Sequence, residues 1–136
     1  MTFMTWTEEF SVGVAVFDEE HKNLVEVINR LYDGICGGNV QETLHRVTDD
    51  LIEHAIVHFR HEEMYFDDTR FPLAAEHKAM HEDLKKQVLA YRSEIDRRDS
   101  KLLAFEMLRF LREWLAQHIQ IDDKKYGEYL NSKGIR

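Results

Sequence analysis

The chain has 136 residues, of which 43% are hydrophobic and 32% are charged, and its formal net charge is −8. A chain of this length can bury a real core without disulfides, so we interpret residues 1–136 as a single domain. The negative charge argues against nucleic acid and anionic membrane surfaces as partners.

The compartment is indicated by features that the sequence lacks. No apolar run approaches the ~20 residues that a membrane span requires, and the first four residues do not resemble the start of a signal peptide. The only cysteine, Cys36, cannot form an intramolecular disulfide, which fits a reducing compartment, and we expect it to pack near a helix end. We therefore expect a cytoplasmic domain with no membrane contact of its own. A domain cut from a larger receptor would have the same features.

The first elements expected are an arm and a helix. Residues 1–17 contain aromatic residues among small and β-branched ones, and we interpret them as a non-helical arm. A helix then begins at a cap, Asp18, and ends at Gly37 and Gly38. Its apolar residues recur at three- and four-residue steps, which is the pattern of an amphipathic helix.

Three further helices follow. The second opens at Asn39, with Glu42 three residues later in a pattern like a capping box. Pro72 suits the first position of the third helix, and Asp99 or Ser100 caps the fourth. Short connections between long amphipathic helices favour antiparallel neighbours. The sequence thus predicts an all-α fold, an antiparallel up-down four-helix bundle over residues 18–131.

Histidines and carboxylates lie on the apolar stripes of these four helices. His58 precedes Glu62 by four residues and His77 precedes His81 by four, so each pair can reach a common point on one helix face. The other inward donors are His21, His118 and an aspartate that follows His118. Nitrogen and oxygen donors without thiolates suit iron, manganese or zinc, and seven donors of which two can bridge suggest two metals.

The aspartate after His118 presents a geometric difficulty. Asp123 lies five residues on, a rotation of about 500° that leaves it about 140° away from His118 on a regular α-helix. Asp122 fits a regular helix better. If Asp123 is the ligand, the backbone between Ile119 and Asp123 must widen to a π-type turn or break.

A non-metal interpretation of these residues has to be weighed. One pair of histidines four residues apart is weak evidence for a metal site, because the chain has eight histidines. Buried imidazoles and carboxylates are costly without a compensating partner, however, and here they lie on all four stripes. Among the other histidines, we expect His45 and His61 to be solvated and His54 to face inward behind the ligands.

Several segments of the chain together match the pattern of one known family: Trp6, Val12-Gly13, Phe17–Lys22, His58–Met64, His77, His81, Trp114–Ile119 and Asp123-Lys124. On these segments the chain resembles the hemerythrin family, and in particular bacterial hemerythrin domains. The resemblance covers nearly the whole sequence, and within the family the chain is similar to domains attached to bacterial chemotaxis receptors. A departure is His54, where many bacterial members have tyrosine.

The resemblance implies a non-haem centre of two iron ions, cycling between iron(II) and iron(III), with an oxo or hydroxo bridge. It implies that Glu62 and Asp123 also bridge the irons. His77, His81 and His118 would complete one iron, and His21 and His58 would bind the other and leave a position open for dioxygen. By the same resemblance, the oxygen pocket would be walled by Trp114, Leu115 and Ile119.

The function expected is reversible dioxygen binding for sensing, carriage or storage. For a sensing role, the expected partner is a chemotaxis receptor to which the domain is fused or through which it signals. The alternative is a di-iron oxidase or peroxidase, an enzyme class that usually has about four glutamate ligands in its bundle. We expect no enzyme activity beyond a weak peroxidase-type side reaction. A zinc hydrolase is disfavoured because no His-Glu-x-x-His motif is present. A metal-free interaction bundle remains a further alternative.

Overall fold

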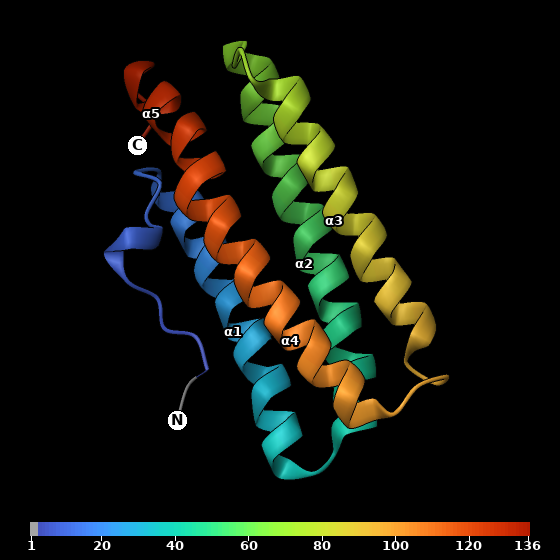
Figure 1. Cartoon of the computed structure of the whole chain (residues 1–136). Helices are drawn as coiled ribbons and strands as arrows, with labels where there is room; N and C mark the ends of the chain where they lie inside the picture. Colours follow the sequence, from blue (N-terminus) through green and yellow to red (C-terminus); the bar gives the residue numbers. More distant parts are fainter. Residues whose placement is uncertain (1–2) are drawn as a thin grey trace.

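Four long helices form the body of the molecule in the computed structural model, which describes residues 3–136. Their bounds are α1 Ala15–Gly37, α2 Val40–Thr69, α3 Ala74–Glu94 and α4 Ser100–Gln117. Figure 1 shows that successive helices run in opposite directions, with α1 beside α4 and α2 beside α3. The described residues contain no strand. The predicted all-α, antiparallel up-down four-helix bundle is confirmed.

Three shorter elements complete the fold at the ends of the chain. The arm, predicted to be non-helical, contains one 3-10 helix, η1 (Glu8–Phe10), so that prediction is wrong for these residues. At the other end, α4 is continued by a π-helix, η2 (His118–Asp123), and by α5 (Lys124–Ser132). In Figure 1 the arm runs along the outside of α1 towards the end of the bundle where α5 lies. Among residues 3–136, no helix has the length and apolar character needed to cross a membrane.

The helix boundaries agree with the sequence pattern at some ends and differ at others. The first helix ends as predicted, because Gly38 takes a left-handed conformation (φ 85°) that suits glycine. Asp99 accepts a hydrogen bond from the Leu102 amide, as expected of an N-cap. Asn39 precedes α2 but makes no side-chain capping bond. Pro72 lies in the turn before α3 and not in its first position.

The start of α1 lies three residues earlier than the sequence predicted. The helix begins at Ala15, so Asp18 lies in its first turn. There the Asp18 carboxylate accepts hydrogen bonds from the Val12 amide (2.8 Å) and the Ser11 hydroxyl (2.6 Å). Asp18 therefore ties the arm to the helix instead of marking the boundary between them.

The arm is held against the bundle at both of its ends. Asn29 of α1 accepts hydrogen bonds from the amides of Phe3 and Met4 and donates one to the Met4 carbonyl. At the other end, the Val12 carbonyl packs so closely on Gly127 that a Cβ at that glycine would lie 2.0 Å from the Val12 oxygen. The arm is therefore part of the packed structure.

The core divides along the bundle axis into an apolar half and a polar half. Leucine, isoleucine, valine and methionine side chains fill the half near the α1–α2 and α3–α4 connections, including Leu31, Leu44, Leu103 and Met107, each at most 1% exposed. The buried histidines and carboxylates lie in the other half. Cys36, expected to pack, is exposed, because it follows the buried Ile35 in the last turn of α1 and lies on the outer side of that helix.

Candidate metal centre

The antiparallel topology brings the predicted donors to one level of the bundle. His21 lies near the start of α1 and His58 lies in the second half of α2, where the chain has returned to the same end. His77 lies at the start of α3, and His118 follows the end of α4. Because successive helices run in opposite directions, the beginning of one helix lies beside the end of the next at the same level of the bundle.

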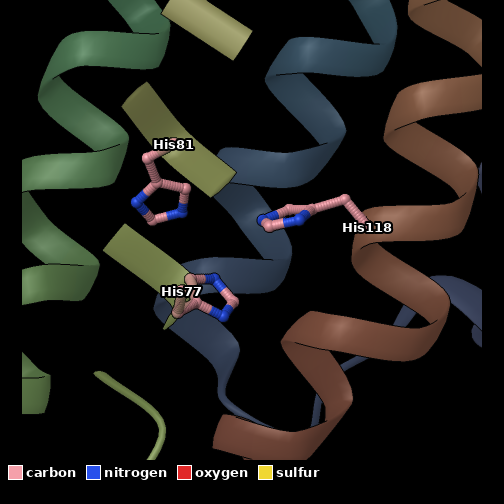
Figure 2. Close-up of side chains that lie close together, drawn as sticks. All are labelled: His77, His81 and His118. Carbon is pink, nitrogen blue, oxygen red and sulfur yellow. The ribbon is translucent and has the colours of Figure 1, made fainter. Parts of the chain in front are cut away.

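Three histidines form one group of donors. His77 and His81 of α3 and His118 of η2 are at most 4% exposed, and one ring nitrogen of each lies within 4.8 Å of the others. Figure 2 shows the three rings turned towards a common space between α3 and the chain at His118. This group is a set of imidazole nitrogens that can hold a metal ion.

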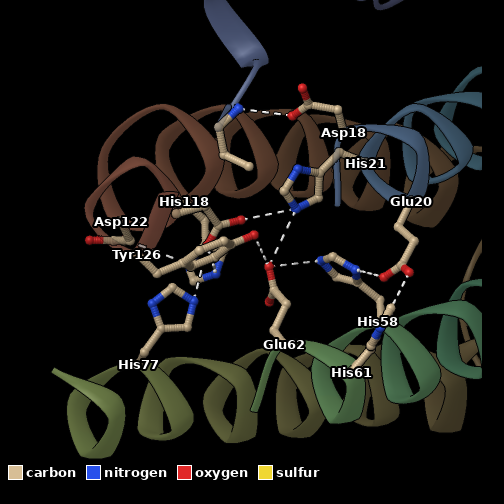
Figure 3. Close-up of polar contacts among 12 residues, drawn as sticks. Asp18, Glu20, His21, His58, His61, Glu62, His77, His118, Asp122 and Tyr126 are labelled. Carbon is tan, nitrogen blue, oxygen red and sulfur yellow. Dashed lines mark hydrogen bonds and ion pairs between the residues drawn. The ribbon is translucent and has the colours of Figure 1, made fainter. Parts of the chain in front are cut away.

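A second group lies beside the first. It consists of His21, His58, Glu62 and Asp123, all buried, again with donor atoms within 4.8 Å of one another. His21 Nε2 lies 3.1 Å from Asp123 Oδ2, and His58 Nε2 lies 3.2 Å from Glu62 Oε2. Figure 3 shows His21, His58 and Glu62 converging between α1 and α2. The structure thus brings all seven predicted residues together in two adjacent groups.

Each carboxylate faces both groups. Glu62 Oε2 faces His58, and its Oε1 lies 3.2 Å from His81 Nε2 in the three-histidine group. Asp123 Oδ2 faces His21, and its Oδ1 lies 3.0 Å from His77 Nε2 and 2.9 Å from His118 Nε2. Two carboxylates arranged in this way can bridge two metal ions.

These buried atoms are not satisfied by one another. The distances between imidazole nitrogens and carboxylate oxygens are short, yet several of the atoms lack a partner in hydrogen-bonding geometry: His21 Nε2, His77 Nε2, His81 Nε2, His118 Nε2, Glu62 Oε1 and both oxygens of Asp123. Leaving buried polar atoms unpaired is costly, and native structures rarely do so. The donor set therefore fits metal ions, which would satisfy all of these lone pairs at once.

The π-helix explains how Asp123 joins the site. η2 spans His118–Asp123 and has the wider turn in which residues five apart lie on one face. Asp123 is 1% exposed, whereas Asp122 is 20% exposed and lies on the outer side of His118, 3.4 Å from its Nδ1. The predicted departure from α geometry is confirmed in its π-type form.

Carboxylates also lie behind the two groups. Glu20 Oε1 lies 2.5 Å from His58 Nδ1, and Glu63 Oε2 lies 2.8 Å from His81 Nδ1. A carboxylate at the second ring nitrogen fixes the orientation of an imidazole and its tautomer. The sequence analysis missed both glutamates, because each lies off the apolar stripe; their only signal was their position directly before His21 and directly after Glu62.

Tyr126 is another residue that the sequence analysis missed. Its hydroxyl donates a hydrogen bond to Glu62 Oε2, and the side chain is fully buried. Burial and the nearby carboxylates raise the Tyr126 pKa well above its ordinary value, so the hydroxyl remains a donor. A helical projection continued from α4 places Tyr126 wrongly, since the π-helix shifts every residue after it.

Two other histidines differ from their predicted positions. His54 was expected to face inward, but it is exposed and lines a surface depression between α1 and α2. His61 was expected to be solvated, but it is half-buried, and its Nδ1 lies 2.7 Å from Glu20 Oε2. Glu20 reaches both His58 and His61 from α1, and that contact across helices is invisible in the periodicity of α2 alone. His45 is exposed, as predicted.

The electrostatics of the metal-free site favour ionised carboxylates beside protonated imidazoles. Burial alone would lower the His58 pKa, but the charges of Glu62 and Glu20 raise it to about 10. Burial disfavours the charge on Glu62, yet the surrounding histidines hold its pKa well below the usual range. The pKa of Asp123 is also lowered, against burial and the Glu62 charge, by His118 and His21. An incoming metal cation would replace these protons.

An apolar cavity of about 20 Å³ lies against the His21 and His58 side of the site. That volume holds about one small molecule. Trp114 and Leu115, two of the three residues expected to wall an oxygen pocket, line this cavity, whereas the third, Ile119, is fully buried without lining it. The remaining lining residues are Leu24, Ile28, Leu51, Ala55, Phe59, Leu84, Leu111, His118 and Asp123.

Aromatic rings cover the outer faces of two histidines. Phe59 stacks on His81 with ring centroids 3.7 Å apart, and Trp114 stacks on His118 at 4.3 Å. Such stacking restricts rotation of the imidazoles and keeps water from their faces. The two stacked rings therefore limit the motion of these imidazoles and the access of water to them.

Comparison with known proteins gives consistent matches over nearly the whole chain. Residues 12–130 match the family model described as the hemerythrin HHE cation binding domain. The chain is 33% identical over 140 residues to bacteriohemerythrin of Methylococcus capsulatus, covering 97% of this chain and 100% of that protein. It is 30% identical over 122 residues to myohemerythrin-1 of Phascolopsis gouldii, covering 89% of each. A crystal structure of wild-type hemerythrin matches with a TM-score of 0.82 and 31% identity, covering 93% of this chain and 96% of that one.

Proposed function

The chain belongs to the hemerythrin family, and on that premise we propose that it binds dioxygen reversibly at a non-haem di-iron centre held by the seven donors described above. The observation that carries this proposal is the position of the two carboxylates. Glu62 and Asp123 each direct one oxygen to the three-histidine group and the other to the His21 and His58 group. Two metal ions bridged by two carboxylates fit that arrangement.

We assign the ligands from the same geometry. His77, His81 and His118 would hold one iron and His21 and His58 the other, and Glu62 and Asp123 would be shared between the two. The two irons, when bound, supply the two electrons that dioxygen accepts on binding and returns on release. The asymmetry of three histidines against two supports dioxygen binding on the His21 and His58 side, where the 20 Å³ cavity lies.

The surrounding side chains control the orientation of the ligands and access of water. Glu20 and Glu63 accept hydrogen bonds from the second nitrogens of His58 and His81, which leaves the Nε2 atoms free to bind metal. The Tyr126 hydroxyl holds Glu62 in its bridging orientation. Trp114 and Leu115 exclude water and protons from the cavity. Without water and protons, the reduced dioxygen cannot leave as hydrogen peroxide, so the oxygenated form is protected from oxidation of its irons.

The di-iron oxidase alternative is not favoured. That enzyme class usually supplies about four glutamates to its metals, whereas the described site has two carboxylates among five histidines. Carboxylate-poor coordination favours reversible binding over cleavage of the oxygen bond. Hemerythrins are oxygen-binding proteins and not enzymes, and we add only a weak peroxidase-type side reaction as a proposal.

The biological setting of dioxygen binding is a further proposal. The domain would serve oxygen sensing, carriage or storage in the cytoplasm, and a sensory role would require attachment to a partner such as a chemotaxis receptor. One observation supports a sensory role: the arm is hydrogen-bonded to α1, and α1 carries the donor His21.

One experiment tests the proposed function directly. The iron-loaded protein is reduced under argon, exposed to oxygen and purged again while the visible spectrum is recorded. We expect two irons per chain and a charge-transfer band that appears with oxygen and disappears on purging. Iron-free purified protein, or a spectrum that does not respond to oxygen, would contradict the proposal.

A further inference from the structure

We propose that an apolar cavity between α2 and α3 is a second dioxygen site, through which the gas reaches the di-iron centre. This inference rests on the proposed function and adds a location and a route to it. The two helices lie side by side along their length (Figure 1).

The outer cavity has a volume of about 90 Å³, several times that of the inner cavity at the histidines. Apolar side chains of both helices form its walls. Lys85 is its only charged neighbour among the described residues, and the Lys85 ammonium lies 2.9 Å from Glu82. The Lys85 side chain can therefore contribute its aliphatic stem to the wall while its charge is directed to Glu82. The full lining is Leu51, Ile52, Ala55, Ile56, Phe59, Leu84, Lys85, Val88 and Leu89.

The two cavities share part of their walls. Leu51, Ala55, Phe59 and Leu84 line both the outer cavity and the inner cavity that contacts His21 and His58. Ala55 has the smallest side chain of the four, and it is buried. Because its methyl group fills less space than the leucine and phenylalanine side chains beside it, Ala55 leaves these larger side chains room to rotate, and their rotation can connect the two cavities.

The chemistry of the walls identifies the occupant. Small apolar cavities lined by leucine, isoleucine and phenylalanine stay dry and take up apolar molecules such as xenon. Dioxygen is uncharged, apolar and small enough for this space. Water and ions find no hydrogen-bonding partner there, so the cavity admits the gas while it excludes the species that would promote oxidation of the centre.

A polar depression on the other side of α2 offers a contrast. It is lined by Glu20, Asn23, Glu53, His54, Val57 and His58, and it also reaches a histidine of the site. Its charged groups hold water, and an apolar gas gains nothing from entering it. The observations therefore favour the α2–α3 cavity as the entrance for dioxygen.

The route is tested by Ala55→Leu in the di-iron protein. Filling the shared wall should slow both dioxygen association and dissociation by about tenfold, because passage must then wait for larger side-chain motions. Ala55 also lines the inner cavity, so the affinity is tested in Val88→Leu, which fills the outer cavity alone. The dioxygen affinity of that variant should change little, because a barrier on a path that serves both directions alters the two rates equally. The matched control is Ala90→Leu, on the exposed side of α3, which should leave both rates unchanged. Unchanged rates in Ala55→Leu with two irons bound would overturn the route.

A second measurement does not depend on oxygen chemistry. Crystals of the protein pressurised with xenon should show xenon in the outer cavity, and Val88→Leu, which fills that cavity alone, should reduce its occupancy. Absence of xenon from the cavity would overturn this inference even if the protein binds oxygen reversibly. An oxygen-insensitive spectrum of the unmodified di-iron protein would instead overturn the proposed function.

Discussion

His118 Nε2 lies 2.9 Å from Asp123 Oδ1 although five residues separate them, because both belong to one π-helical segment. On a regular α-helix these side chains would point about 140° apart. The wider turn aligns a histidine of one donor group with a carboxylate that also faces the other group. The stoichiometry of metal binding should therefore depend strongly on His118.

We expect His118→Ala to reduce iron content from two irons per chain to one or fewer. The substitution removes a nitrogen from the three-histidine group and an ionic neighbour of Asp123. Iron is measured per chain after anaerobic loading and gel filtration. His45→Ala is the control, since His45 is exposed and its ring nitrogen pairs with Asp96 of the α3–α4 connection, away from the donor groups. Full loading of the His118 variant would remove this residue from the ligand set.

Iron loading should release protons and become tighter as the pH rises from 6 towards about 10. The pKa of His58 in the metal-free protein is raised to about 10, so this imidazole carries a proton at neutral pH that iron must replace. Proton release is measured in a weakly buffered anaerobic titration with iron(II) at pH 8. Loading without proton release at this pH would show that His58 is already neutral.

The same raised pKa sets the sign of the stability change in the metal-free protein. The His58 pKa lies above its unfolded value of about 6.5, so its stabilising contribution is complete below that pH and is lost as the pH rises through about 10. We therefore expect the melting temperature of the metal-free protein to fall between pH 8 and pH 11. Bound iron should abolish most of this dependence, because it replaces the proton.

Leu115→Asn should shorten the lifetime of the oxygenated form by about tenfold, since a polar side chain in the cavity wall admits water and protons. Iron content should remain at two per chain, because Leu115 supplies no donor atom. The lifetime is read from the decay of the visible band in air. Leu102→Asn, on the exposed face of α4, is the control. Equal lifetimes in the two variants would place the protective wall elsewhere.

Gly127→Ala should destabilise the protein by about 2–3 kcal/mol, because the new methyl group collides with the Val12 carbonyl in a packed contact. Gly37→Ala is the matched control: nothing lies within 4 Å of a Cβ there, and the greater helix propensity of alanine should stabilise α1 by up to about 1 kcal/mol. Chemical denaturation of both variants measures the difference. Equal stabilities would show that the arm moves away without cost.

Most of the architecture could be predicted from the sequence, because each long helix repeats one apolar pattern many times. The apolar steps of α1 and the glycines at its end are redundant signals, and the donors lie on the same stripes as the core residues. The π-helix was also predictable, since the five-residue spacing of His118 and Asp123 is incompatible with a regular α-helix.

The residues behind the donors could not be predicted in the same way. Glu20 contacts two histidines on another helix, and Tyr126 reaches Glu62 across the bundle. Such contacts depend on the relative rotation and height of two helices, and one helix's periodicity does not determine these. His54 was misplaced for this reason too, because it lies one turn from His58 but on the side that α1 leaves open.

The wide turn at residues 118–123 accommodates one residue more than an ordinary helix would. Deleting a single residue between His118 and Asp123 would leave these two side chains four residues apart, about 40° from each other on a regular α-helix, so the aspartate and the buried Tyr126 and Leu130 after it could keep their places. Straightening the turn without a deletion would instead rotate everything after His118 by about 100° and carry both buried side chains towards solvent. In proteins that share this site, the wide turn and the additional residue should therefore be present together or absent together.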